Sequence, residues 1–269
     1  MIPPFSRQVF HVLSHLRFLF TLLPLFMLTI LIIGAGRSEA QPKSIQALKN
    51  QARRLYWGIG VEQNFTQALS LYETAAALGD GEASFIAGGM YYTGKGAEKS
   101  DVKAFEYLSF AVAEGNAPPE ALRVLAEFYL KGQVTPQNYS KAMQWFHQAA
   151  NKGDALSQNE LGFLYSQGKG VEQNSEKAYD WFREAALQGS AIAQYNVGII
   201  WYTGDGVAES DLKQAYAWFS VAALNKYGAA ILARDFVMSL LSEEELQQAQ
   251  NLAEDIYGEL NPIIPLPPN

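Results

Sequence analysis

The sequence predicts an all-α protein whose helices stack into a right-handed superhelical solenoid. Three observations support this: a motif that recurs five times, a glycine-pair turn inside it, and apolar residues spaced three and four apart. The motif is clearest from Ser157 to Gly189. Anchored on one small residue, its copies lie 36, 38, 36 and 36 residues apart, at Ala52, Gly88, Ala126, Gly162 and Gly198. A period of this length is typical of stacked helical hairpins.

Composition limits the classes of function. The chain has 269 residues, of which 49% are hydrophobic, so it can bury a sizeable core. Its formal net charge of -7 argues against a nucleic-acid partner and against an anionic membrane surface. The sequence contains no cysteine, which excludes disulfides, thiolate metal ligands and cysteine nucleophiles.

Residues 1–40 resemble a secretory signal peptide. A basic region precedes the apolar run Phe18–Ile33, and the small residues Ser38 and Ala40 stand where a signal peptidase reads its substrate. We expect cleavage before Gln41 and a periplasmic or secreted protein. The alternative is an uncleaved anchor, since the run has about the minimum length for a membrane span. We expect a membrane association only in that case.

The first helix of each repeat is predicted from one stripe of residues. In the clearest copy, Leu161, Gly162 and Tyr165 lie on one helical face, which we expect to face the core. The recurrence of Gly or Ala at the Gly162 position indicates that another helix passes too closely for a larger side chain. The turn Gly168–Val171 then ends the helix, because its glycines can adopt positive φ. The copy at Gly132 lacks the second glycine of this turn.

The second helix is predicted from its cap and its small face. Asn174 is the expected N-cap, and the other copies place Asn64, Ser100, Asn138 and Ser210 at this point. Ala178, Trp181, Ala185 and Ala186 follow at helical spacing. We expect the aromatic row that contains Trp181 to fill the core between repeats. These repeats occupy residues 41–228 of the chain.

The combined motif is Ala-x-x-x-Leu-Gly-x-x-Tyr-x-x-Gly-x-Gly-Val, then Lys-Ala-x-x-Trp and Ala-Ala-x-x-Gly. It resembles the Sel1-like repeat family, a relative of the tetratricopeptide repeats, over about residues 45–228. The resemblance implies helical hairpins, no cofactor, and a protein or peptide partner. Similar proteins serve as exported or membrane-linked adaptors in quality control, envelope assembly, signalling and host contact.

Residues 229–258 are predicted to be two capping helices, and residues 259–269 a disordered proline-rich tail. Ser242 and Glu245 form the expected capping box of the second of these helices. After export the one remaining histidine is His147, so a catalytic triad or a histidine metal site is not expected. We predict no catalytic residue, no metal site and no cofactor.

The leading hypothesis is therefore an exported scaffold that binds a peptide or protein in a concave groove. The alternative is an envelope hydrolase or a glycan-binding protein. A hydrolase would show converging carboxylates with raised pKa values, whereas a scaffold would show an open groove lined by aromatic and amide side chains. Helix geometry places one row of residues opposite the core stripe of the first helices. This groove row comprises Arg53, Trp57, Phe85, Arg123, Glu127, Asn159, Phe163 and Tyr195.

Overall fold

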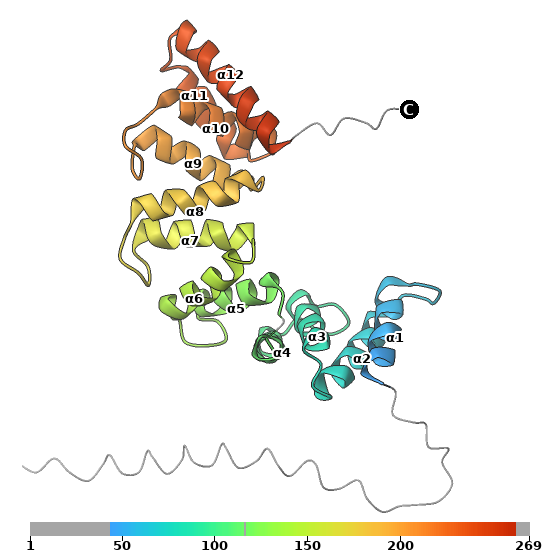
Figure 1. Ribbon diagram of the computed structural model, residues 1–269. Coiled ribbons are helices and arrows are strands. Elements are labelled where there is room, and N and C mark those ends of the chain that lie inside the picture. The colour runs from blue at the N-terminus through green and yellow to red at the C-terminus, as the bar shows by residue number, and fades with distance from the viewer. Residues whose placement is uncertain (1–43, 116, 262–269) are drawn as a thin grey trace, which may run out of the picture. The chain divides into compact units, whose positions relative to one another are not determined.

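The computed structural model describes residues 44–115 and 117–261, and the expected signal peptide and residues 262–269 lie outside these ranges. The described residues form twelve helices (Figure 1). In chain order they are α1 (Ile45–Trp57), α2 (Phe65–Ala77), α3 (Gly81–Thr93), α4 (Asp101–Ala113), α5 (Pro119–Lys131), α6 (Tyr139–Ala150), α7 (Ala155–Gln167), α8 (Ser175–Leu187), α9 (Ala191–Thr203), α10 (Leu212–Leu224), α11 (Gly228–Met238) and α12 (Glu243–Leu260). Apart from one isolated bridge between Asp205 and Val207, this part of the chain contains no β-structure. The all-α prediction is confirmed, and the handedness of the superhelix stays a prediction.

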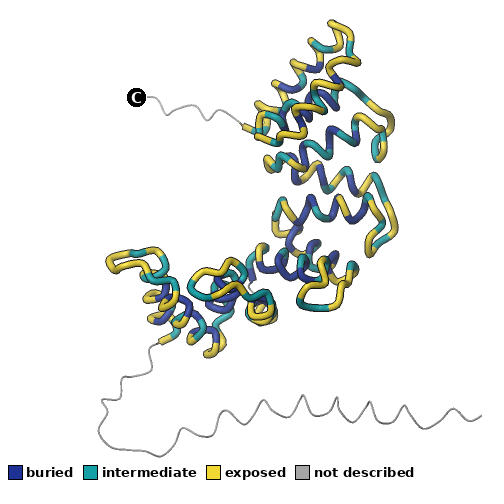
Figure 2. Tube along the Cα trace, turned by 180° about the vertical axis from the view of Figure 1, so that it is seen from behind, coloured by how far each residue is buried: buried dark blue, intermediate teal, exposed yellow. Residues whose placement is uncertain are grey.

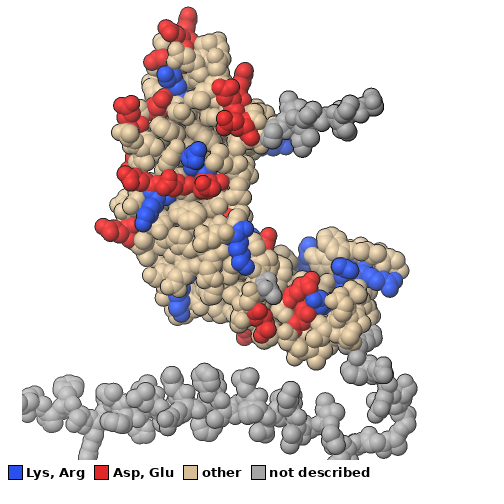
Figure 3. Space-filling view, viewed as in Figure 1, with Lys and Arg blue, Asp and Glu red and all other residues tan. Residues whose placement is uncertain are grey.

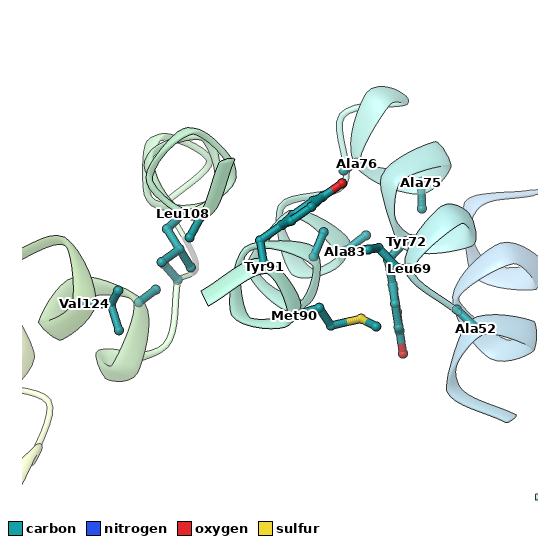
Figure 4. Close-up of a cluster of buried hydrophobic side chains, with 14 of the residues drawn as sticks. Ala52, Leu69, Tyr72, Ala75, Ala76, Ala83, Met90, Tyr91, Leu108 and Val124 are labelled. Carbon is teal, nitrogen blue, oxygen red and sulfur yellow. The ribbon is translucent and has the colours of Figure 1, made fainter. Parts of the chain in front are cut away.

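Each odd-numbered helix from α1 to α9 pairs with the next helix to form one hairpin, and successive hairpins stack. We call the two members the first and second helix of a repeat. Figure 2 shows buried positions along the sides on which neighbouring helices meet. The close-up in Figure 4 shows how Ala52, Leu69, Met90, Leu108 and Val124 bring five consecutive helices into one apolar cluster.

Polar caps fix where the helices begin. Asn64, Ser100, Asn138 and Asn174 each accept a hydrogen bond from a backbone N–H of the following first turn, as predicted. For α10 the predicted cap was wrong by one residue, because Asp211 rather than Ser210 caps the helix. The preceding turn is one residue longer in this repeat, which moves the helix start from the aligned position.

Small residues in the first helices allow close contact with the second helix of the same repeat. A Cβ atom built on Gly162 would lie 2.7 Å from the Phe182 ring, and one built on Gly198 would lie 2.6 Å from Phe219. The predicted close approach is therefore confirmed, but the residue that fills the core was misassigned. Phe182 is buried and the preceding Trp181 is only half-buried, since the second helix turns the later residue toward the glycine.

In the turns after α3, α7 and α9, the second glycine lies against the preceding repeat. A Cβ atom on Gly206 would lie 2.4 Å from the Ser175 carbonyl oxygen, and one on Gly96 would lie 2.4 Å from the Phe65 carbonyl oxygen. Both glycines have positive φ. The turn after α5 has Val134 in this place, and its side chain packs against the core instead. The glycine pair therefore serves both the turn and the stacking of repeats.

Two buried glutamines connect neighbouring repeats. Gln194 in α9 donates to the carbonyl oxygen of Ala186 (3.1 Å) and accepts from the Asn225 amide (2.9 Å). Gln158 in α7 accepts from the Gln188 amide at 2.6 Å and donates to a carbonyl of α6. Gln194 thus links the C-terminal end of α8 to that of α10, and Gln158 links the C-terminal end of α6 to that of α8.

The C-terminal helices cover the array incompletely. The expected capping box is present, with Ser242 accepting from the Glu245 N–H and Glu245 accepting from the Ser242 N–H. Helix α12 packs on α10 through Ala249 and continues to Leu260, two residues beyond the predicted end of the capping helices at residue 258. It can do so because residues 243–261 contain no proline. On α11, Ile231, Leu232 and Phe236 remain exposed.

Candidate functional site

Three of the eight residues in the predicted groove row form contacts between successive first helices. Arg123 lies 3.5 Å from the Asp154 carboxylate at the start of α7. Asn159 is buried and accepts a hydrogen bond from Asn196 of α9 at 3.1 Å. Tyr195 packs on the Tyr227 ring with the centroids 5.1 Å apart. These three residues occupy the same position in their repeats and contact the next first helix. The half-buried Phe85 has the same position in its repeat but lines a pocket beside α1.

Three members of the row are exposed, and a fourth is engaged in an ion-pair network. Trp57 is 66% exposed, Phe163 is 45% exposed, and Arg53 is also exposed. Glu127 accepts hydrogen bonds from Arg123 (2.9 Å), from Lys131 (3.1 Å) and from the Tyr92 hydroxyl (3.2 Å). The structure therefore divides the row into residues that build the face of the first helices and residues that remain accessible on it.

A pocket of about 360 Å³ opens between α1 and α3. We call it the α1/α3 pocket. It brings together three residues of the groove row with seven that sequence reasoning did not select. Its lining comprises Arg53, Tyr56, Trp57, Tyr72, Phe85, Ile86, Gly89, Met90, Thr93 and Lys95. Lys95 was missed because it lies in the glycine-pair turn after α3, and its only sequence signal was a position next to Gly94.

A second pocket of about 290 Å³ opens on the same face between α7 and α9. We call it the α7/α9 pocket. Phe163 lines it together with Asn196, Thr203 and Asp205. In the motif alignment, Phe163 corresponds to Arg53 and Asp205 corresponds to Lys95. The two pockets thus share a position in the repeat while their charges differ.

The middle of this face carries two carboxylates, Glu127 and Glu160, beside the cations of Arg123 and Lys131. Burial raises the pKa of the Glu160 carboxyl on α7, and the nearby charge of Glu127 on α5 raises it further. The cation of Lys131 opposes that effect. Glu127 itself accepts the three hydrogen bonds described above. The pair thus consists of Glu160, whose pKa is raised, and Glu127, whose carboxylate is already hydrogen-bonded. Both pockets are lined mainly by aromatic, aliphatic and amide groups.

The opposite face, formed by the second helices, carries a chain of hydroxyl and carboxylate contacts. Glu73 accepts from the Tyr91 hydroxyl at 2.6 Å and from the Tyr107 hydroxyl at 3.3 Å. Burial, followed by the charge of Glu73, raises the pKa of Tyr107 to about 12. Lys103 donates to the Tyr91 hydroxyl at 3.0 Å and lies over the Tyr91 ring. The hydroxyl, carboxylate and ammonium groups are thus hydrogen-bonded to one another, and they connect α2, α3 and α4.

His147 takes the position of Glu73 two repeats later. Its Nε2 atom lies 3.3 Å from the Tyr165 hydroxyl, and its ring meets Trp181 edge to face with the centroids 5.4 Å apart. Burial lowers the pKa of His147, and the Lys177 cation lowers it further. Within the described ranges, no group of three or more potential ligand side chains could hold a metal ion. None of the described helices combines the length and apolarity needed to cross a bilayer.

Charge is distributed unevenly along the array. Figure 3 shows basic side chains gathered over the α1–α2 hairpin and acidic side chains over α12. Helix α1 contains Lys49, Arg53 and Arg54 and no acidic residue, whereas α12 contains six acidic residues and no basic one. Helix α1 is therefore a basic element within an acidic protein.

The model of the Sel1 repeat matches residues 47–80, 81–116, 119–154, 155–190 and 191–227. The chain belongs to the Sel1 repeat family. The five matched segments correspond to the hairpins α1–α2 to α9–α10, and this agrees with the resemblance seen in the motif. A crystal structure of a Sel1 repeat protein from Oxalobacter formigenes is similar with a TM-score of 0.67 and 26% identity. The similarity covers 79% of this chain and 87% of that chain.

A second Sel1-type structure is a protective antigen of uropathogenic Escherichia coli, with a TM-score of 0.55 and 28% identity. That similarity covers 84% of this chain and 57% of the antigen. Among curated proteins, chitin synthase regulatory factor 1 of Schizosaccharomyces pombe is 33% identical over 112 residues. The aligned part is 40% of this Sel1 repeat chain and 24% of the regulatory factor, so the chain spans about a quarter of that relative.

Proposed function

We propose that this Sel1 repeat protein is an exported scaffold that binds a peptide or protein segment along the face of its first helices. One observation carries the proposal: two pockets recur on that face, and exposed aromatic side chains, Trp57 and Phe163, lie at them. Exposed aromatic side chains are common anchors in protein recognition. A curated relative that is named a regulatory factor also supports a binding role.

The composition of the pockets supports the scaffold over the hydrolase or glycan-binding alternative. A hydrolase needs two carboxylates that converge on a cleft, and neither pocket contains such a pair. The α7/α9 pocket combines Phe163 with Asn196 and Thr203, which suits a peptide backbone that needs hydrogen-bond partners.

Site-specific photo-crosslinking in living cells tests the binding face. A photo-reactive phenylalanine analogue replaces Trp57 or Phe163 in the full-length chain, and Val102 provides the matched control. Val102 is 56% exposed but lies on the second helix α4. We expect the same partner band from Trp57 and Phe163 and none from Val102. A partner captured only from Val102 would place the binding surface on the other face.

The export of the protein is part of the proposal and has its own test. We expect the mature chain to begin at Gln41 and to occur in the periplasm or in the medium. Ser38 and Ala40 are the reason for this expectation. Cell fractionation followed by N-terminal sequencing distinguishes the two forms. An intact residue 1 in the membrane fraction would instead support the uncleaved anchor.

A further inference from the structure

We propose that the α1/α3 pocket binds a large apolar side chain flanked by carboxylates, so that its partner segment is an acidic peptide with an aromatic or large aliphatic residue. This inference rests on the proposed function and adds the chemistry of the ligand. It follows from the walls of the pocket, from the residue that keeps it open, and from the charges at its rim.

The walls of the pocket are aromatic and ordered by mutual contacts. The Tyr56 ring meets Trp57 edge to face with the centroids 5.0 Å apart, and Tyr56 meets Phe65 at 5.1 Å. Tyr72 and Met90, which are 4% and 2% exposed, form the buried part of the lining. A volume of about 360 Å³ lies at the small end of ligand pockets, as expected for a site that takes one side chain.

Gly89 keeps the pocket open. It lies in the middle of α3, and a Cβ atom built on it would have no neighbour within 4 Å. The neighbouring Gly88 differs, because its Cβ would lie 2.9 Å from Leu108. Packing therefore explains Gly88 but leaves Gly89 without a structural reason. At the Gly89 position the other first helices carry Arg53, Glu127, Phe163 and Ile199.

The rim of the pocket is basic. Arg53 and Lys95 line it, and no acidic residue does. Lys95 donates to the Tyr56 hydroxyl at 3.1 Å, and Arg53 lies 3.5 Å from the Asn50 side-chain oxygen. Within the described residues neither cation forms an ion pair, although the protein carries a net charge of -7. Two cations at the edge of an apolar site favour a ligand whose hydrophobic anchor has carboxylates beside it.

The nearby acidic residues are already engaged. Asp80 lies 3.1 Å from the Lys49 ammonium, and Glu82 is paired with the same ammonium. They therefore leave Arg53 and Lys95 available. The α7/α9 pocket supplies an internal contrast, since it has Phe163 and Asp205 in place of these two cations. We infer that the α7/α9 pocket does not select for acidic segments.

Three synthetic peptides test the inference on the purified protein. The probes are Asp-Glu-Phe-Asp-Glu, Lys-Lys-Phe-Lys-Lys and Asp-Glu-Gly-Asp-Glu, all acetylated and amidated so that only side chains carry charge. Binding is followed by chemical-shift changes of the residues that line the pocket. We expect the acidic phenylalanine peptide to bind at least tenfold more tightly than either of the others, and to weaken as salt is raised. Equal affinity for the acidic and basic peptides would overturn the proposal.

Variants locate the binding. Gly89→Met should fill the pocket and abolish binding while the circular-dichroism spectrum stays helical and the Tm is not lowered, because the space beside Gly89 is empty and methionine favours the helix. The double variant Arg53→Glu with Lys95→Glu should lower the affinity at least tenfold. Val102→Ala, on the second helix α4 and outside the binding face, is the matched control and should bind as the parent does. Undiminished binding by folded Gly89→Met would refute the site.

The crosslinking experiment separates this inference from the proposed function. If a partner crosslinks at Trp57 and Phe163 but is still captured by the Arg53→Glu, Lys95→Glu variant, the ligand chemistry is wrong and the scaffold stands. If no partner crosslinks at either position, the proposed function itself fails.

Discussion

Two junctions in this array stack repeats by different means. At the α8–α9 junction, Gly206 lies against the carbonyl of Ser175, and Gln194 hydrogen-bonds to the end of α8. At the α4–α5 junction the corresponding residues are Val134 and Leu122, which make no such polar contact. The connection before α5 is also two residues longer than the one before α9. The α8–α9 junction therefore has a glycine contact and a glutamine hydrogen bond that the α4–α5 junction lacks. At the α4–α5 junction, apolar packing takes their place, beside the Tyr92–Glu127 hydrogen bond.

The difference shows that a repeat can lack the second glycine and the buried glutamine and still stack on its neighbour. Leu122 and Leu125 remain buried, so α5 keeps its hydrophobic contact with the preceding repeat. The Lys152 ammonium also donates to the carbonyl of Ala117 at 2.8 Å and ties the longer connection to the next turn. Apolar burial thus maintains the stack, whereas the glycine and glutamine determine its register.

The largest expected effect comes from the stacking glycine. Gly206→Ala should destabilise the protein by about 3 kcal/mol or more, because positive φ alone costs about 1–2 kcal/mol and the new methyl group would overlap the Ser175 carbonyl. Gly60→Ala is the matched control. Gly60 also has positive φ, but its nearest neighbour is the flexible Arg54 side chain at 3.4 Å. Urea denaturation should show a clearly smaller loss for Gly60→Ala; equal losses would mean that the stacking contact is not real.

Exchanging the buried residues of the two junctions should cost less. Gln194→Leu leaves the Ala186 carbonyl and the Asn225 amide without this partner, at about 1–3 kcal/mol. Leu122→Gln should cost a similar amount, because it buries an amide at a junction that lacks the polar partners. Thermal unfolding of each variant provides the measurement. If Gln194→Leu were as stable as the parent, apolar packing would suffice at both junctions.

A smaller effect is expected at the start of α5. Pro118 is the N-cap there and offers no side-chain hydrogen bond, whereas Asp154 caps α7 through the Ser157 N–H at 2.7 Å. Pro118→Asp should stabilise the protein by about 0.5–1 kcal/mol through the new cap. The loss of proline rigidity in the unfolded chain reduces the gain. A fall in the urea midpoint would show that the rigid proline matters more than the cap.

The smallest expected effect is a loss of stability at acidic pH that involves His147 on α6, in the repeat after the α4–α5 junction. The pKa of His147 is lowered in the folded state, so its neutral form is favoured there. This contribution is complete above the unfolded pKa of about 6.5 and is lost as the pH falls from there toward the folded value. Melting curves from pH 7.5 to 5 should therefore show a decline that is reduced in His147→Gln. If the Tm of both proteins fell equally, the loss of stability at low pH would come from titratable groups other than His147.

The sequence predicted the helices and the turns well, because these depend on local chemistry. Periodic apolar residues, polar caps and positive-φ glycines act within one repeat, and most of these signals recur from copy to copy. The core residue was misplaced by one position, since Trp181 and Phe182 are both aromatic and periodicity cannot distinguish their directions. For α10, Ser210 and Asp211 are both good caps, and a single inserted residue decided between them.

The site was harder to predict, because it depends on contacts between repeats. Arg123 and Asn159 are polar residues on the expected face, but their partners lie on the next first helix, which the pattern of one helix does not show. The α1/α3 pocket depends on an empty space beside Gly89, and a single sequence does not distinguish this glycine from the packed Gly88. Lys95 reaches the pocket from a turn rather than from the predicted row.

The positions of the tryptophans make intrinsic fluorescence informative about how the repeats unfold. Four of the five, Trp145, Trp181, Trp201 and Trp218, belong to the repeats after the α4–α5 junction, whereas the first two repeats contain only the exposed Trp57. Indole emission therefore reports mainly on the C-terminal repeats, while circular dichroism reports on all twelve described helices. If the two signals change at different denaturant concentrations, the α4–α5 junction is a cooperative boundary, and emission and ellipticity together measure its position without any label.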